Sequence, residues 1–279
     1  MSQKQKDFHD LKDALYANAG RLWTVSVVAN ATALVAALVA ITCAERSGVG
    51  LGAAMVAFLA PGVSAVLREA AAIPTGRADK IRHLILLSDS LGRTIPAAEQ
   101  AQVRRWVAGD ALAPAPYVSP YYTSKFPQGA SRLADNLAES AYFTEHLAEK
   151  LVRFLAWGGI AIVGALVAAV YLASTVSVAP GVLPPIARGI AIVAAFLVSG
   201  DYALLLWRFA RLQQAARQAY DGATRIRGLE GLELADVLPL LIEYDSAHVQ
   251  SPPLPRWLHA SNMQELNDDY RQSHGESSK

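Results

Sequence analysis

Residues 22–44 read "LWTVSVVANATALVAALVAITCA" and residues 47–67 read "SGVGLGAAMVAFLAPGVSAVL", and neither stretch contains a charged side chain. An α-helix rises about 1.5 Å per residue, so each stretch is long enough to cross the ~30 Å apolar core of a bilayer. Only Glu45 and Arg46 separate the two stretches, which leaves room for a tight turn. Together they predict a hairpin of two transmembrane helices.

A second apolar region runs from Phe154 to Trp207, and the prolines of "SVAPGVLPPIAR", residues 177–188, interrupt it. Proline cannot donate a backbone hydrogen bond and does not continue a helix well. We therefore divide this region into a third span, Phe154 to about Thr175, and a fourth, Ile186 to about Trp207. The predicted fold class is an all-α membrane protein whose four transmembrane helices form two hairpins.

Composition agrees with a membrane protein and suggests its orientation. The chain is 53% hydrophobic and only 18% charged, and its mean hydropathy is +0.24. Its 25 basic and 24 acidic residues nearly cancel, which argues against a partner that is DNA or RNA. Of the basic residues, only Arg46 and Arg188 lie in the hairpin turns. The positive-inside rule then predicts that both termini and the long insert are cytoplasmic.

These boundaries divide the chain into hairpins and cytoplasmic parts. In the insert, Pro74 and Gly76 predict that one helix ends and that another starts near Arg77. No helix breaker separates the apolar spacing at Leu137 and Leu151 from the third span, so we expect one helix to continue from the insert into the membrane. The predicted segments are a cytoplasmic N-terminus (1–21), hairpin 1 (22–67), a cytoplasmic helical insert (68–153), hairpin 2 (154–207) and a cytoplasmic helical C-terminal region (208–279).

Motifs for catalysis are missing from the sequence. There is no G-x-x-x-x-G-K-[ST] phosphate loop, no nucleophile elbow, no H-E-x-x-H and no kinase signature. The six histidines are scattered singly, and the one cysteine, Cys43, excludes an internal disulfide framework. We expect no enzymatic activity, no cofactor and no metal site.

Two polar residues interrupt the apolar spans, Asn30 in the first and Asp201 in the fourth. An ionisable group inside a bilayer costs several kcal/mol and is a functional candidate by default. Both side chains are candidates to line a pore when several copies assemble. Asp201, however, is about six residues from Trp207, near the predicted cytoplasmic face, where simple solvation explains the charge equally well.

Cations and aromatic rings lie close together in the insert. Arg104, Arg105 and Trp106 combine two positive charges with a stacking surface, which is how proteins hold nucleotides. The alternative is a solvated helix face beside an aromatic loop that packs on its own subdomain or on the membrane surface. The possible nucleotide-binding residues are Arg104, Arg105, Trp106, Tyr121, Tyr122 and Lys125.

Residues 119–147, "SPYYTSKFPQGASRLADNLAESAYFTEHL", resemble the SMODS-associated four-transmembrane family. In that family, a tyrosine-containing turn precedes a helix that carries a basic residue and an asparagine. A later tyrosine, a proline turn and a leucine-asparagine pair also match, and the layout of two plus two spans agrees over nearly the whole chain. The matching positions are Tyr121, Tyr122, Arg132, Asn136, Tyr244, the "PPLP" that ends at Pro255, Leu266 and Asn267.

The resemblance implies a pore-forming effector of bacterial cyclic-oligonucleotide antiphage signalling (CBASS). A partner nucleotidyltransferase would make a cyclic nucleotide on infection, and this signal would lead a homo-oligomer to permeabilise the bacterial inner membrane. The protein would be a multi-pass membrane protein in the lipid bilayer, with both termini cytoplasmic. The alternative function is a non-conducting four-helix scaffold that recruits a cytoplasmic partner.

Overall fold

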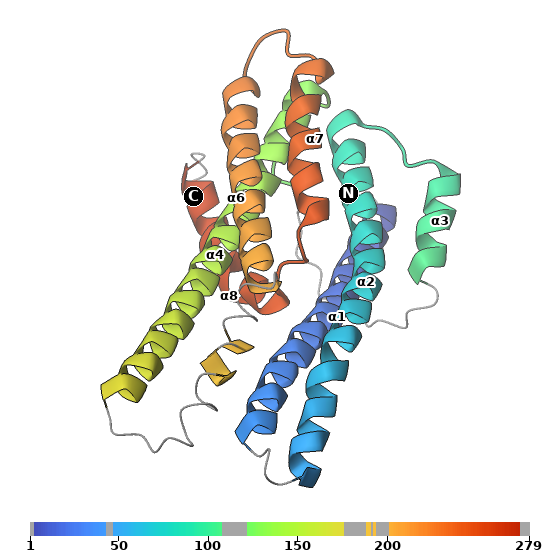
Figure 1. Ribbon diagram of the computed structural model, residues 1–279. Helices are drawn as coiled ribbons and strands as arrows, with labels where there is room; N and C mark the ends of the chain where they lie inside the picture. Colours follow the sequence, from blue (N-terminus) through green and yellow to red (C-terminus); the bar gives the residue numbers. More distant parts are fainter. Residues whose placement is uncertain are drawn as a thin grey trace. The chain divides into compact units, whose positions relative to one another are not determined.

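The computed structural model describes residues 3–42, 47–107, 122–175, 188–190, 192–193 and 201–273, and the regular secondary structure of these residues is helical. This result confirms the all-α fold class. Figure 1 shows the elements, which are α1 (Gln3–Thr42), α2 (Ser47–Leu91), α3 (Ala97–Val107), α4 (Ala130–Thr175), α6 (Asp201–Ile226), α7 (Leu234–Gln250) and α8 (Arg256–Ser273).

Three helices, α1, α2 and α4, are long and apolar enough to cross a membrane. Their apolar stretches leave large side chains uncovered: Phe58 is 83% exposed and Trp157 is 70% exposed. A lipid environment removes the cost that water would impose on such surface. Residues 22–42 of the first predicted span and the predicted spans at 47–67 and 154–175 lie on these helices. Residues 186–187, 191 and 194–200 of the predicted fourth span lie outside the described residues.

The chain divides into two compact units, and α1, α2 and α4 each contribute residues to both of them. Unit 1 contains most of the charged residues, and unit 2 contains the apolar stretches. Unit 1 consists of Met1–Arg21, Ala71–Glu149 and Arg208–Lys279, and unit 2 consists of Leu22–Ala70 and Lys150–Trp207.

The helix break predicted at Pro74 and Gly76 is wrong, because α2 continues without interruption from Ser47 to Leu91. Pro74 removes the amide that would bond to the carbonyl four residues earlier, and this normally weakens a helix. Packing offsets the loss, since Ala71, Thr75 and Ala78 around the proline are buried. The Thr75 hydroxyl also donates to the Ala71 carbonyl at 2.8 Å.

Small side chains let the helices of unit 1 approach one another closely. Alanines on α4 pack against alanines on α6, and α7 closes the same core with Val237, Leu241 and Tyr244. A second core joins α1, α2 and α3 through Leu15, Ile81 and Val103, among others. The alanines of the first core are Ala134, Ala138 and Ala141 on α4 and Ala216, Ala219 and Ala223 on α6.

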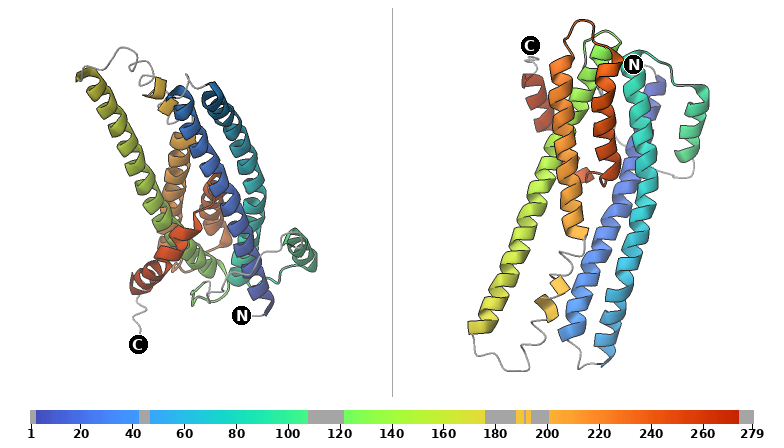
Figure 2. Two further views of the ribbon diagram at one scale, coloured as in Figure 1. Left: turned by 90° about the horizontal axis from the view of Figure 1, so that it is seen from below. Right: turned by 45° about the horizontal axis from the view of Figure 1, so that its top comes forward.

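In the described part of unit 2, two buried serines form hydrogen bonds with residues three or four positions away. The parts of α1 and α2 that belong to it lie side by side (Figure 2), and small residues such as Ser26 and Ser64 are buried there. The Ser26 hydroxyl donates to the Trp23 carbonyl at 2.7 Å, and Arg68 Nη2 donates to Ser64 Oγ at 3.0 Å. These bonds leave mainly apolar groups facing outward on these two helices, as a lipid environment requires.

Candidate functional site

Unit 1 contains a buried polar network centred on Asp79 of α2, whose side chain is 4% exposed. Tyr16 of α1 donates a hydrogen bond to Asp79 Oδ1 at 2.5 Å, and His248 Nδ1 of α7 lies 3.0 Å from the same oxygen. Burial alone would raise the pKa of Asp79, but His248, Arg82 and Tyr16 outweigh it and lower the pKa to about 2. Asp79 therefore carries a negative charge within the core and joins three helices.

The network continues through a second carboxylate, Asp245 of α7. Arg82 Nη2 pairs with Asp245 Oδ1, and His83 Nε2 pairs with Asp245 Oδ2. Arg82 also lies with its Nε 3.9 Å from Asp79 Oδ1, so one buried guanidinium is shared between two carboxylates. A buried ion of this kind is tolerated only when its partners stay in place, so the arrangement fixes α7 against α2.

Tyr244 extends the network to α4. It is 1% exposed, its hydroxyl lies 2.7 Å from Thr144 Oγ1, and the Arg82 guanidinium lies over its ring at 5.2 Å from the centroid. Burial raises the pKa of Tyr244, so the phenol stays neutral and can donate a hydrogen bond. The ring thus packs as a hydrophobic group, and its hydroxyl is satisfied between α7 and α4.

A second polar cluster joins the end of α2 to the start of α4. Arg132 binds Asp89 in bidentate fashion, with Nε and Nη2 each 3.0 Å from a carboxylate oxygen. Asn136, which is fully buried, donates Nδ2 to Asp89 Oδ2 at 2.8 Å and to Ser90 Oγ at 3.0 Å. The Gly129 amide, just before α4, donates to the Ser90 carbonyl at 2.8 Å. These bonds set the register between the two helices.

The described end of the tyrosine-rich loop is tied to α4 by a buried carboxylate. Glu139 Oε2 accepts hydrogen bonds from the Thr123 amide at 2.9 Å and from its hydroxyl at 3.1 Å. The neighbouring Tyr122 is half-buried and its ring packs against both hydrophobic cores of unit 1. Tyr122 is therefore largely a packing residue in this structure.

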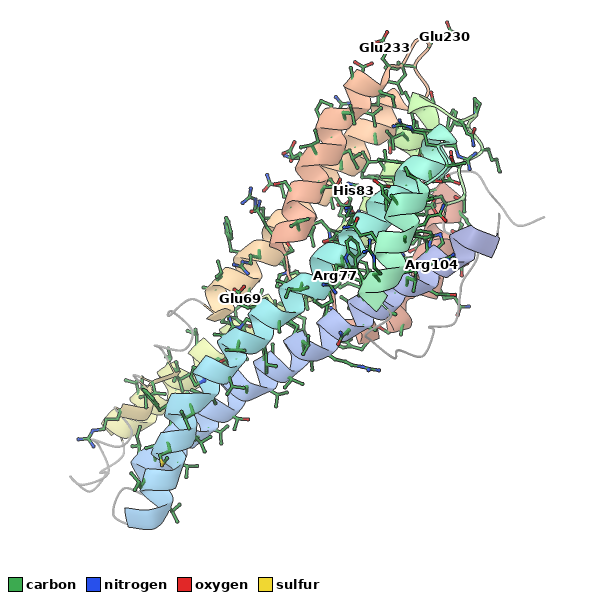
Figure 3. All side chains as sticks on the ribbon, turned by 90° about the vertical axis from the view of Figure 1, so that its right-hand side faces the viewer. Glu69, Arg77, His83, Arg104, Glu230 and Glu233 are labelled. Carbon is green, nitrogen blue, oxygen red and sulfur yellow. The ribbon has the colours of Figure 1, made fainter. Side chains whose placement is uncertain are left out.

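A cluster of cations surrounds Trp106 of α3. Arg77 Cζ lies 5.8 Å and Lys80 Nζ 5.4 Å from the Trp106 ring centroid, and both residues come from α2. Lys80 Nζ also lies 3.5 Å from Gln102 Oε1, one helical turn before Trp106. Figure 3 shows the two helices with Arg77 and Arg104 labelled. The structure thus adds two cations to the pair that the sequence analysis selected.

The remaining predicted residues are dispersed. Asn30 lies half-buried on α1, Asp201 begins α6 with its side chain outside the description, and Tyr121 is not described. Pro255 precedes α8, and its carbonyl accepts from the Leu258 amide at 3.0 Å. Asn267 lies half-buried on α8, and Lys125 is exposed beside the loop. The structure does not bring these residues into one site.

Sequence reasoning missed the carboxylates and histidines of the buried network. A signal was present on α2, where Asp79 and Arg82 recur three residues apart between apolar residues that face a core. On α7, Asp245 and His248 show the same spacing. Charged pairs on an otherwise apolar helix face indicate buried partners, because an isolated buried charge is costly.

Two other features of unit 1 concern ligand binding, a groove and the placement of side chains that could hold a metal ion. A groove of about 710 Å³ lies between α6 and α7, and it is lined by Arg211, Gln218, Ile242 and Glu243, among others. Over the described part of the chain, no group of three or more histidine, cysteine, aspartate or glutamate side chains is placed to hold a metal ion. The buried network joins α1, α2, α4 and α7 through side chains of these helices, so its geometry suits mechanical coupling between them.

Comparisons of the chain with protein-family models, with curated proteins and with solved structures gave no match.

Proposed function

We propose that the protein is a membrane effector that self-associates and permeabilises the inner membrane when unit 1 receives a nucleotide second messenger during antiphage defence. The supporting observation is that α1, α2 and α4 each run without a break through residues of both units. A change in the packing of unit 1 can then alter the tilt or rotation of the apolar stretches on the same helices. The trigger must bind the open form more tightly than the closed form.

The buried network gives unit 1 the stiffness that this proposal needs. Asp79, Arg82 and Asp245 join α1, α2 and α7, and Tyr244 links them to α4. Packed, hydrogen-bonded cores switch between discrete arrangements and deform little. A ligand that favours one arrangement of unit 1 would therefore shift three apolar helices together.

Membrane potential is the direct test. A bacterial host that expresses the protein together with a cyclic-oligonucleotide synthase, or that is supplied with cyclic nucleotides, is followed with a voltage-sensitive dye. Signal-dependent depolarisation is the expected result, and a strain expressing the protein without the signal is the control. If a verified signal binds and the potential does not change, the pore function is wrong, and the scaffold that recruits a partner becomes the better explanation.

Asp201 and Asn30 are the residues we propose to line the pore. The variants Asp201→Ala and Asn30→Ala should reduce signal-dependent depolarisation while the protein still reaches the membrane. Unaltered depolarisation in Asp201→Ala would remove that carboxylate from the mechanism. The matched control is Asp268→Ala, which removes an exposed carboxylate on α8 of unit 1, outside the apolar stretches.

A further inference from the structure

The cations around Trp106 differ in their surroundings from two other arginines of unit 1. Among the residues that the structure describes, Arg77, Lys80 and Arg105 form no ion pair with a carboxylate. The buried Arg82 and the half-buried Arg132 of the same unit are, in contrast, paired with aspartates. Like charges gathered on one surface repel one another, and a bound anion relieves that repulsion.

Helix geometry places three of these cations on one surface. Gln102, which contacts Lys80, is a neighbour of both Arg105 and Trp106, because residues three and four apart adjoin on a helix. Arg105 thus lies at the exposed edge of the surface that Gln102 and Trp106 form, nearly opposite Val103, which packs into the core with α2. Arg104 lies two positions after Gln102, about 200° further around the helix, and faces elsewhere.

We propose that Arg77, Lys80 and Arg105, arranged around Trp106 and Gln102, form a binding site for a soluble phosphate-bearing anion. The cation–π contacts hold Arg77 and Lys80 over the indole, so the cationic heads are partly ordered before a ligand arrives. Guanidinium and ammonium groups bind phosphate through strong charge-assisted hydrogen bonds. The role of this site in signalling rests on the proposed function, whereas the binding of the anion does not.

Phosphate can come from a soluble nucleotide or from a lipid headgroup, and the length of α2 favours the first source. Arg68 is the first charge after the apolar stretch of α2. Arg77 and Lys80 follow it by nine and twelve residues, which correspond to about 14 and 18 Å of helix. The headgroup layer on each side of a bilayer is only about 5–8 Å thick. Along the helix, Arg77 and Lys80 therefore follow Arg68 by more than the thickness of the headgroup layer, which favours a soluble ligand.

The test uses the purified full-length protein in detergent and measures its unfolding temperature and its binding of tripolyphosphate and of cyclic di-adenylate by calorimetry. The triple variant Arg77→Gln, Lys80→Gln and Arg105→Gln removes the site. The matched control is the triple variant Arg93→Gln, Arg225→Gln and Arg271→Gln, which removes the same charge from exposed cations elsewhere in unit 1.

We expect both anions to raise the unfolding temperature of the wild type and of the control. The site variant should bind about a hundredfold more weakly, since each charge-assisted bond to phosphate is worth about tenfold and solvent screens part of it. Without anion, the site variant should unfold close to the wild-type temperature, because the loss of like-charge repulsion and the loss of the two cation–π contacts oppose each other. This readout also shows that the variant folds.

Equal binding by the site variant and the control would overturn the proposal, as would no binding by the wild type. A parallel arm compares nanodiscs of phosphatidylcholine with and without phosphatidylglycerol. Stabilisation by phosphatidylglycerol alone, lost in the site variant, would overturn the soluble source and assign the site to lipid headgroups. A protein that depolarises cells but does not bind these anions would retain the pore function and lose this site.

Discussion

Replacement of Asp245 by asparagine isolates the ion pair that joins α7 to α2. The substitution leaves Arg82, whose side chain is 5% exposed, without its closest carboxylate. Removing one partner of a buried pair costs about 3–5 kcal/mol. Asp79 still lies 3.9 Å from Arg82 Nε and offsets part of this loss, so we expect about 3 kcal/mol. For a unit of this size, that corresponds to a fall of about 6–12 °C in the unfolding temperature.

Far-ultraviolet circular dichroism of the full-length protein in detergent at neutral pH measures this fall. Glu243→Gln is the control, since Glu243 is an exposed carboxylate on the same helix. The double variant Arg82→Met with Asp245→Asn should recover part of the loss, because no buried guanidinium remains unpaired and Asp79 keeps Tyr16 and His248. An Asp245→Asn variant that unfolds within about 2 °C of the wild-type temperature would refute the reasoning. So would a double variant whose fall in unfolding temperature equals the sum of the falls of the two single variants.

Three further changes test other parts of the structure. Burial and nearby Lys12 lower the pKa of His259 to about 4 from its ordinary 6.5. Between these two pH values the folded state binds fewer protons than the unfolded state, so the free energy of unfolding should fall as the pH drops from 6.5 to 4. In acid titrations followed by fluorescence, His259→Gln should make this fall shallower. Gly92 directly follows α2 with φ 66°, and a Cβ there would overlap the side chain of Gln128. Gly92→Ala should destabilise the protein by at least about 1 kcal/mol in thermal unfolding, and adding Gln128→Ala should relieve only the steric part of this loss. Pro74→Ala restores a helical hydrogen bond and should raise the unfolding temperature, whereas a fall would show that the proline is needed for packing.

Local composition was sufficient to predict the helices and the apolar stretches. Residues 22–42 of the first charge-free stretch lie on α1, and residues 47–67 lie on α2. The expected continuity between the insert and the third span is confirmed, since α4 runs from Ala130 to Thr175. These predictions depend only on neighbours in sequence. The break at Pro74 failed because buried packing on both sides of the proline outweighs its local cost.

Contacts between distant residues could not be predicted in the same way. Arg82 and Asp245 are 163 residues apart, and periodicity shows that a residue faces a core without showing which partner it meets. Adjacency in sequence identified Arg105 and Trp106, but the cations of α2 join them only once α3 packs on α2. Tyr122 illustrates the opposite error, because an aromatic side chain in a loop fits a binding surface and a core equally well until its neighbours are known.

The unbroken α2 imposes a fixed helical phase on its sequence. Each residue adds about 100° of rotation and 1.5 Å of rise, so a one-residue insertion near Ala70 would turn Asp79, Arg82 and the whole later part of the helix out of register with the apolar part. An insertion of seven residues, close to two full turns, would nearly restore the phase. Natural variation in the length of this segment should therefore occur in steps of about seven residues or be absent.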